Sequence, residues 1–317
     1  MILCFAVLMA GALRLPFERT LTVELQQANL LPAKLEVKTG ARIGQTFSAV
    51  SLGGLRTLVA TFLNLRAFAF FSEQRWEDVA ESYDTIVDLA PRTRYYWDTG
   101  SWHQAYNAAS YYLYESDLPP LRRKLAWRES ILKGRDFLER AIQNNPDDWQ
   151  LLEALGFLLS DANKIAAFGS PGESYEKAYE AYKAAVDTGN ARAFTERAAL
   201  YSLARVPGRE TEALTLARKV EKDLDHAGTP TLYGLLYVLE YYPDPNQDVM
   251  KLVDTIFESR KQAYEILGNQ WLRTRDHFPV HGIARAITLL EAELQVSEAQ
   301  SVLKHKLQSP MNPEEEF

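Results

Sequence analysis

The sequence contains a single cysteine among its 317 residues, and this scarcity excludes several kinds of site. Cys4 lies in an apolar N-terminal segment, so the body of the chain has no thiol for a disulfide, a multi-thiolate metal site or a cysteine nucleophile. No small residue precedes Cys4, as one usually does in a lipoprotein signal. We therefore interpret Cys4 as an apolar side chain of that segment.

The sequence also has no excess of basic over acidic residues. The chain has 35 Lys and Arg against 42 Asp and Glu, which gives a net charge of −7, and no basic stretch stands out. A nucleic-acid-binding protein needs a basic surface to neutralise phosphates, so nucleic acid is not expected as a partner. No glycine-rich phosphate loop follows a predicted strand, and no Gly-x-Ser-x-Gly motif occurs.

Metal-ligand residues are sparse as well. Of the five histidines, only His277 and His281 lie close together, next to Asp276. Two histidines four residues apart share a metal only when one continuous helix carries both. Pro279 stands between them and is typical of a first helical turn, which leaves His277 outside the helix. We expect a turn here, and no metal site or cofactor.

Long apolar runs are few, and the clearest one is at the N-terminus. Residues Ile2 to Leu13 carry no charge, but about 12 residues fall short of the roughly 20 that cross a bilayer as a helix. Ala10-Gly11-Ala12 fits a signal-peptidase site. Residues 1–17 are thus predicted to be a signal peptide, or an inner-membrane anchor if Arg14 reaches the interface. The alternative is the buried first helix of a cytosolic protein.

A repeated pattern is the main positive signal. Each copy has a small residue, an apolar or aromatic residue four positions on, a small or aliphatic residue three further on, and a helix terminator five beyond. The copies are Val79, Tyr83, Ile86, Pro91; Gly134, Leu138, Ala141, Pro146; Ala178, Tyr182, Ala185, Asn190; and Ala213, Ala217, Val220, Asp225. Steps of four and three place the first three residues on one helix face. Repetition of a face that cannot be buried alone predicts stacked helical hairpins.

The surrounding sequence predicts where the helices lie. Residues 18–50 are interpreted as a spacer with a short helix. Ser51–Phe71 is apolar but contains two arginines, which favours a buried helix over a membrane span. Further helices are predicted at Trp76–Leu89, from Tyr95 to about Tyr114, at Leu121–Asn144, from about Trp149 with Asp147 and Asp148 as capping residues, and from about Ser174 after a loop at Asn163–Gly172.

Part of this pattern resembles a known family. Leu155-Gly156 in a first helix, followed by Ala178, Tyr182, Ala185 and Asn190, resembles the tetratricopeptide repeat, as does Trp97 after the first copy. That family is a 34-residue helix-turn-helix unit with small residues where its helices touch. Only the last interval between terminators, from Asn190 to Asp225, is close to this length. Gly100-Ser101 and Ala199-Leu200 replace the Leu-Gly pair that the family prefers.

The resemblance implies an all-α fold, a tetratricopeptide-like α-solenoid of about four to five helical hairpins over residues 51–245. Residues 246–309 are expected to form C-terminal capping helices at Val249–Leu267, near Trp271 and at Ile283–Leu307. Residues 310–317 read as a disordered acidic tail. A looser likeness, from Gly53-Gly54-Leu55-Arg56 to Trp97 and Trp102, is to bacterial repeat proteins with an N-terminal membrane segment. It implies the cell envelope, with the body on the periplasmic side, secreted or anchored to the inner membrane.

In such arrays the first helix of each hairpin lines a concave groove. The residues predicted to face it are Asn64, Arg66, Phe68, Asp98, Trp102, Ala105, Asn107, Glu153, Phe157, Arg197 and Tyr201. An aromatic surface with single charges suits an extended peptide or a helix from a partner. The alternative for Trp97, Trp102, Tyr106 and Phe157 is that they belong to the core between repeats.

The predicted function is a non-catalytic scaffold, exported or membrane-anchored, that binds a protein or peptide partner within a bacterial envelope assembly. One alternative is a helical-toroid hydrolase in which inward carboxylates, such as Glu153, Asp161 and Asp98, perform acid-base chemistry. Another is a cytosolic tetratricopeptide adaptor. Paired catalytic carboxylates need a matched separation and a closed pocket, which an open array does not offer.

Overall fold

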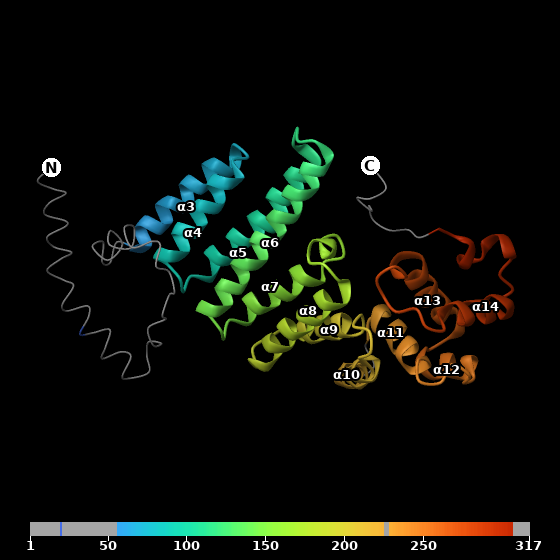
Figure 1. The fold of residues 1–317 in the computed structure, drawn as a ribbon. Coiled ribbons are helices and arrows are strands. Elements are labelled where there is room, and N and C mark those ends of the chain that lie inside the picture. The colour runs from blue at the N-terminus through green and yellow to red at the C-terminus, as the bar shows by residue number, and fades with distance from the viewer. Residues whose placement is uncertain (1–19, 21–55, 225–227, 307–317) are drawn as a thin grey trace, which may run out of the picture. The chain divides into compact units, whose positions relative to one another are not determined.

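The computed structural model describes residues 20, 56–224 and 228–306, and all regular structure in these ranges is helical (Figure 1). The all-α prediction is confirmed. The α-helices from residue 56 onward are α3 (Arg56–Ser72), α4 (Trp76–Leu89), α5 (Arg94–Trp102), α6 (Pro120–Asn144), α7 (Trp149–Ser160), α8 (Pro171–Asp187), α9 (Ala193–Leu203), α10 (Glu210–Asp223), α11 (Pro230–Tyr241), α12 (Val249–Ile256), α13 (Arg260–Thr274) and α14 (Ile283–Glu293). The predictions for residues 1–17 and 310–317, and nearly all of 18–50, lie outside the described residues.

The described residues form two compact units. The first ends at Pro146 and holds α3, α4, α5 and almost all of α6, while the second begins at Asp147 and holds α7 to α14. The three residues Pro119–Leu121 group with the second unit.

The repeated pattern describes the buried faces of four helices. All of its small, apolar and aromatic positions, on α4, α6, α8 and α10, are buried. These helices end at Leu89, Asn144, Asp187 and Asp223, two or three residues before the terminators that the sequence predicts. Steps of four and three therefore identified the packing face of each helix.

Side-chain caps set several helix starts. The carboxylate of Asp148 accepts hydrogen bonds from the backbone N–H groups of Gln150 and Leu151, as the sequence predicts for the start of α7. Ser170 caps α8 in the same way, with Pro171 in the first turn. Helix α8 consequently begins three residues before the predicted start at Ser174.

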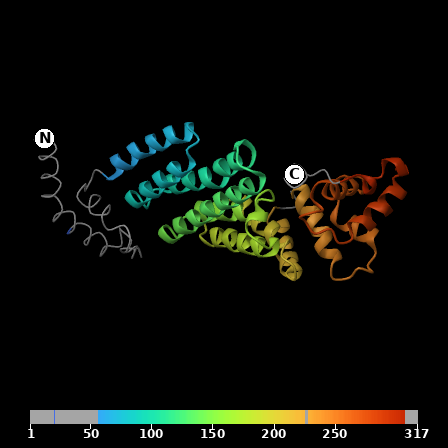
Figure 2. The same ribbon diagram turned by 45° about the horizontal axis from the view of Figure 1, so that its top comes forward.

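In the first unit, neighbouring helices pack through small residues and aromatic rings. Helix α3 packs on α4, and α4 on α5. Gly134 of α6 lies against the segment after α5, since a Cβ placed on it would be 2.6 Å from the Cβ of Ala105. The rings of Trp97 and Phe137 join α5 to α6 with centroids 4.9 Å apart. Figure 2 gives a second view of these helices.

Helix α3 does not match the prediction of a buried first helix. Its large apolar side chains Leu58, Phe62, Leu65 and Phe68 are 65% to 69% exposed. Only Ala60 and Ala67 are buried, because α3 packs on α4 through its small residues. The apolar sequence identified the helix correctly but not the face that it buries.

The helix after α5 changes its geometry. Residues His103–Ala108 and Tyr111–Glu115 form π-helical turns, which continue α5 to the predicted end near Tyr114. Wider turns rotate the following side chains away from the positions of an α-helix. Ala105, predicted to face the groove, is instead buried against Gly134.

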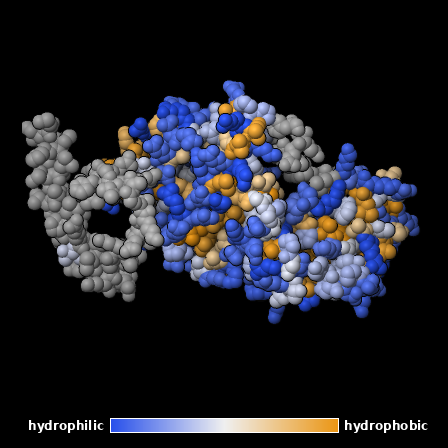
Figure 3. Space-filling model, in the orientation of Figure 1, coloured by the Kyte–Doolittle hydropathy of each residue, from blue (hydrophilic) through white to orange (hydrophobic). Residues whose placement is uncertain are grey.

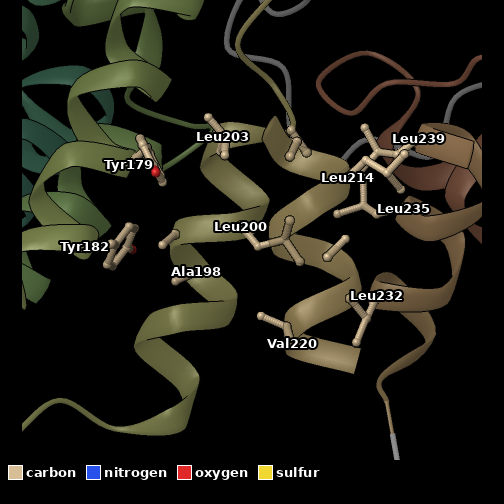
Figure 4. Packing of buried hydrophobic residues seen from close by; sticks show 14 of the residues in the cluster. Tyr179, Tyr182, Ala198, Leu200, Leu203, Leu214, Val220, Leu232, Leu235 and Leu239 are labelled. Carbon is tan, nitrogen blue, oxygen red and sulfur yellow. The ribbon is translucent and has the colours of Figure 1, made fainter. Parts of the chain in front are cut away.

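In the second unit, α7 to α11 each pack on the next helix in the chain. A continuous core joins them, and Figure 4 shows Tyr179 and Tyr182 of α8 facing the side chains of α9, with Leu214 and Leu235 further along. A second core joins α11 to α12, α13 and α14. The dense apolar sequence of α11 serves both cores.

The C-terminal helices differ from their predicted bounds. The predicted helix Val249–Leu267 is two helices, α12 and α13, because the chain is extended at Phe257 and Ser259, where Ser259 caps α13. Trp271 belongs to α13 and has no short helix of its own. Helix α14 ends at Glu293, and only short 3₁₀ turns follow up to Lys304. None of the helices within the described ranges has the length and apolarity needed to cross a membrane.

Candidate functional site

The predicted groove residues of α3 have different environments. Asn64 is half-buried, and its Oδ1 accepts a hydrogen bond of 2.9 Å from the hydroxyl of Tyr83. Arg66 is exposed, with its guanidinium carbon 5.2 Å from the centroid of the Phe70 ring. Phe68 is exposed, so Asn64 is held by the fold while Arg66 and Phe68 face solvent.

The predicted residues of α5 and its continuation surround Trp102. The Trp102 ring stacks on Tyr106 at 4.0 Å and is still 49% exposed, whereas Trp97 is a core residue. Asn107 is half-buried and its Nδ2 lies 2.9 Å from Nδ1 of His103. Burial lowers the pKa of His103. Asp98, one turn before Trp102, is exposed.

In the second unit, Glu153 connects α7 to the start of α9. Its largely buried carboxylate forms an ion pair with Arg192 and accepts a hydrogen bond from the hydroxyl of Thr195. Thr195 is fully buried. These contacts place α7 and the first turn of α9 side by side, with α8 packed on both.

Both α7 and α9 expose aromatic side chains near this junction. Phe157, one turn after Glu153, is 48% exposed, and Phe194 at the start of α9 is 45% exposed. Apolar side chains gather over α7 on the face of the molecule shown in Figure 3. Neither ring belongs to the core. The alternative interpretation of Phe157, as a core residue between repeats, is therefore wrong.

Arg197 and Tyr201 lie one and two turns further along the same face of α9 as Phe194. Arg197 is half-buried, and no hydrogen bond or ion pair joins it to another described residue. The hydroxyl of Tyr201 lies 2.8 Å from Oγ1 of Thr229, and burial raises the pKa of Tyr201. We call Phe157, Phe194, Arg197 and Tyr201 the α7–α9 surface.

The sequence reasoning missed Arg205, which continues the four-residue spacing of Arg197 and Tyr201 just beyond the end of α9. Its guanidinium carbon lies 3.6 Å from the centroid of the Phe278 ring and 4.8 Å from that of Tyr175. The Nε of Arg205 and the hydroxyl of Tyr175 are shut off from solvent without a hydrogen bond of good geometry to a described residue, although the two side chains are close enough to interact with each other. Burial lowers the pKa of Arg205 to about 10.

The acidic group beside this arginine is Asp276. The carboxylate of Asp276 favours the charged form of Arg205 and so raises the pKa of Arg205, which opposes the effect of burial. Asp276 and Arg205 nevertheless form no ion pair. Asp276 is instead 2.6 Å from Nδ1 of His277. His277 lies in the turn between α13 and α14, as predicted, but Pro279 is not in a first helical turn, because α14 begins only at Ile283 and His281 also lies in the turn. Within the described ranges, no group of three or more potential ligands is gathered closely enough to hold a metal ion.

These residues come from three separate parts of the second unit. Arg205 follows α9, Tyr175 lies near the start of α8, and Phe278 lies between α13 and α14. Only the spacing of Arg197, Tyr201 and Arg205 was visible in the sequence. Phe278 contacts this face twice, since its ring also lies 6.3 Å from that of Tyr201 in an edge-on arrangement.

Comparisons with known proteins give no further identification. No family model, no curated protein and no solved structure matches this chain.

Proposed function

We propose that this protein is a non-catalytic helical-repeat scaffold with a tetratricopeptide-like solenoid arrangement, which binds a protein or peptide partner on the α7–α9 surface. The observation that carries the proposal is that α7 and α9 expose the rings of Phe157 and Phe194, and that Arg197 of α9 forms no hydrogen bond or ion pair with another described residue. Aromatic and arginine side chains are the types that contribute most to protein interfaces.

The repeat arrangement is supported by the four buried copies of the sequence pattern and by the consecutive packing of α7 to α11. Glu153 supports a structural role over acid-base chemistry, because Arg192 and Thr195 already hold its carboxylate. Phe68 and Trp102 give the first unit exposed aromatic side chains of its own. The apolar segment and cleavage pattern of residues 1–17 support a place in the cell envelope.

A site-specific crosslinking experiment tests the proposal. A photo-crosslinking phenylalanine analogue is placed at Phe157, and a matched control chain carries it at Leu289, which is 39% exposed on α14. The expected result is one specific protein partner captured from position 157 and not from position 289.

The captured partner is then purified and its affinity measured by calorimetry. We expect Phe157→Ala combined with Arg197→Glu to weaken binding by about tenfold or more, with Leu289→Ala changing it by less than about twofold. Equal crosslinking from both positions, or an unchanged Kd for the double variant, would contradict the proposal.

A further inference from the structure

Arg205 has an environment that is unusual for a cation. Arg205 is half-buried: its guanidinium is packed between the end of α9, the start of α8 and the turn before α14, and its Nε is shut off from solvent without a hydrogen bond of good geometry. No carboxylate forms an ion pair with it among the described residues. A cation that is partly removed from water in this way usually has an acidic partner, because the loss of hydration is unfavourable.

The packing of the rings indicates where a ligand would bind. Phe278, at 3.6 Å, lies against the guanidinium group, as a stacked aromatic ring does. A guanidinium that is stacked on a ring keeps its N–H donors pointing outward in its own plane, where two of them can bind one carboxylate. The hydroxyl of Tyr175, which lies beside Arg205 and interacts with it, supplies one more donor.

The charges nearby favour an anion with a single negative charge. Arg205 is the cation that faces these rings, while Asp276 acts electrostatically on Arg205, and both Asp276 and Asp161 act on Tyr175. A phosphate group carrying nearly two charges would be repelled by Asp276 more strongly than a carboxylate, and a single guanidinium would not neutralise it.

We propose that Arg205, with Phe278 and Tyr175, binds a carboxylate of the partner peptide, from either an acidic side chain or a C-terminus. This inference rests on the proposed function, because Arg205 extends the face of α9 that carries Arg197 and Tyr201. The partner is thereby a peptide that combines apolar contacts along α7 and α9 with one carboxylate at the end of α9.

The test is a titration of the full chain with small probes, observed through the arginine Nε–H resonances in NMR spectra at constant ionic strength. N-acetylalanine represents a C-terminal carboxylate, the C-terminal amide of N-acetylaspartate represents an acidic side chain, and inorganic phosphate represents a dianion. We expect a saturable shift of the Arg205 resonance with at least one carboxylate, with a Kd on the order of 1–10 mM.

Variants assign and control the signal. Arg205→Lys removes the resonance and, with it, the saturable response, whereas Arg273→Lys, at an exposed position in the last turn of α13, leaves both unchanged. The stronger of the two carboxylate probes identifies the source of the carboxylate. Absence of saturation with both carboxylates in the wild-type chain, or tighter binding of phosphate than of either, would overturn the proposal whether or not the variants fold.

The two proposals fail differently. If the partner captured at position 157 binds Arg205→Met as tightly as it binds the wild type, the carboxylate site is refuted and the scaffold function stands. If carboxylates shift the Arg205 resonance but no partner is captured at position 157, the scaffold function is refuted, and the affinity of Arg205 for a carboxylate stands without a peptide partner.

Discussion

Gly156 of α7 lies directly against the ring of Tyr182 on α8. A Cβ placed on Gly156 would be 2.8 Å from Cγ of Tyr182 and 2.9 Å from both of its Cδ atoms. Tyr182 is buried, and its hydroxyl lies 3.3 Å from that of Ser160 at the end of α7. Burial raises the pKa of Tyr182 to about 12. The distance between α7 and α8 is thus set by a position that has no side chain.

Gly156→Ala should therefore destabilise the second unit. A methyl group at this position has to push Tyr182 aside, and such overpacking costs about 1–3 kcal/mol, more than the helix propensity gained. The measurement is the free energy of unfolding from urea denaturation followed by circular dichroism. Gly268→Ala is the matched control, because its Cβ would meet Val302 at an ordinary 3.7 Å, and it should raise stability by about 0.5–1 kcal/mol. An equal effect of both variants would contradict this explanation.

Two substitutions at Glu153 should distinguish the contribution of its hydrogen bond to stability from the contribution of its charge. Glu153→Ala leaves the hydroxyl of Thr195 buried without an acceptor, which costs about 1–3 kcal/mol. In Glu153→Gln the amide oxygen still accepts from Thr195, and the lost ion pair is with Arg192, which is exposed, so the expected loss is below about 1 kcal/mol. Urea denaturation of both variants checks the order. A larger loss in Glu153→Gln than in Glu153→Ala would show that the charge, rather than the acceptor, matters.

His103 should make the stability of the first unit dependent on pH. Burial against Phe71 and Tyr83 lowers its pKa below the ordinary value of 6.5, so the unfolded chain takes up the proton at a higher pH than the folded chain. The stability contributed by neutral His103 is present above about pH 6.5, and it is lost as the pH falls from there toward the folded-state pKa. In His103→Gln this part of the pH dependence should be missing. Parallel slopes for the two proteins between about pH 5 and 7 would contradict the assignment.

Arg205→Met should leave the free protein more stable, by about 1 kcal/mol. The methionine fills similar space against Phe278 without the unfavourable desolvation of an unpaired charge, and this gain exceeds the lost interaction with the rings. Thermal and urea denaturation in a buffer free of carboxylates measure the change. A clear decrease in stability would mean that Arg205 serves the fold rather than a ligand.

The sequence was sufficient to predict which faces of α4, α6, α8 and α10 are buried. The spacing of Ala178, Tyr182 and Ala185 places these residues on one side of α8. In an α-helix, the number of residues between two positions determines the angle between their side chains around the helix axis. The cap at Asp148 and the end of α4 at Leu89, two residues before Pro91, were also predicted, since they depend on residues that are close together in the chain. Local rules determine these features.

What the sequence did not reveal depends on contacts between distant segments. The exposure of Phe62 follows from the small-residue face by which α3 meets α4, and no periodicity distinguishes the two faces of so apolar a helix. Nothing in the sequence around Arg205 distinguishes it from other residues that follow a helix. Its environment depends on the contact with Phe278, which lies more than 70 positions later in the chain. The predicted site residues Phe157, Arg197 and Tyr201 lie on neighbouring helices, but only the fold identified the arginine beyond them.

The π-helical turns after Trp102 have a consequence for insertions and deletions. Each residue of an α-helix turns the chain by about 100°. A one-residue deletion between His103 and Ala108 would therefore rotate the following residues of the helix about its axis by roughly this angle. Tyr111, whose ring now lies 5.8 Å from that of Trp76, would leave this neighbour. The π-helical turns therefore change the angular positions of the side chains partway along the helix. Residues before and after these turns can then each face their own neighbours, which a uniform α-helix would not allow.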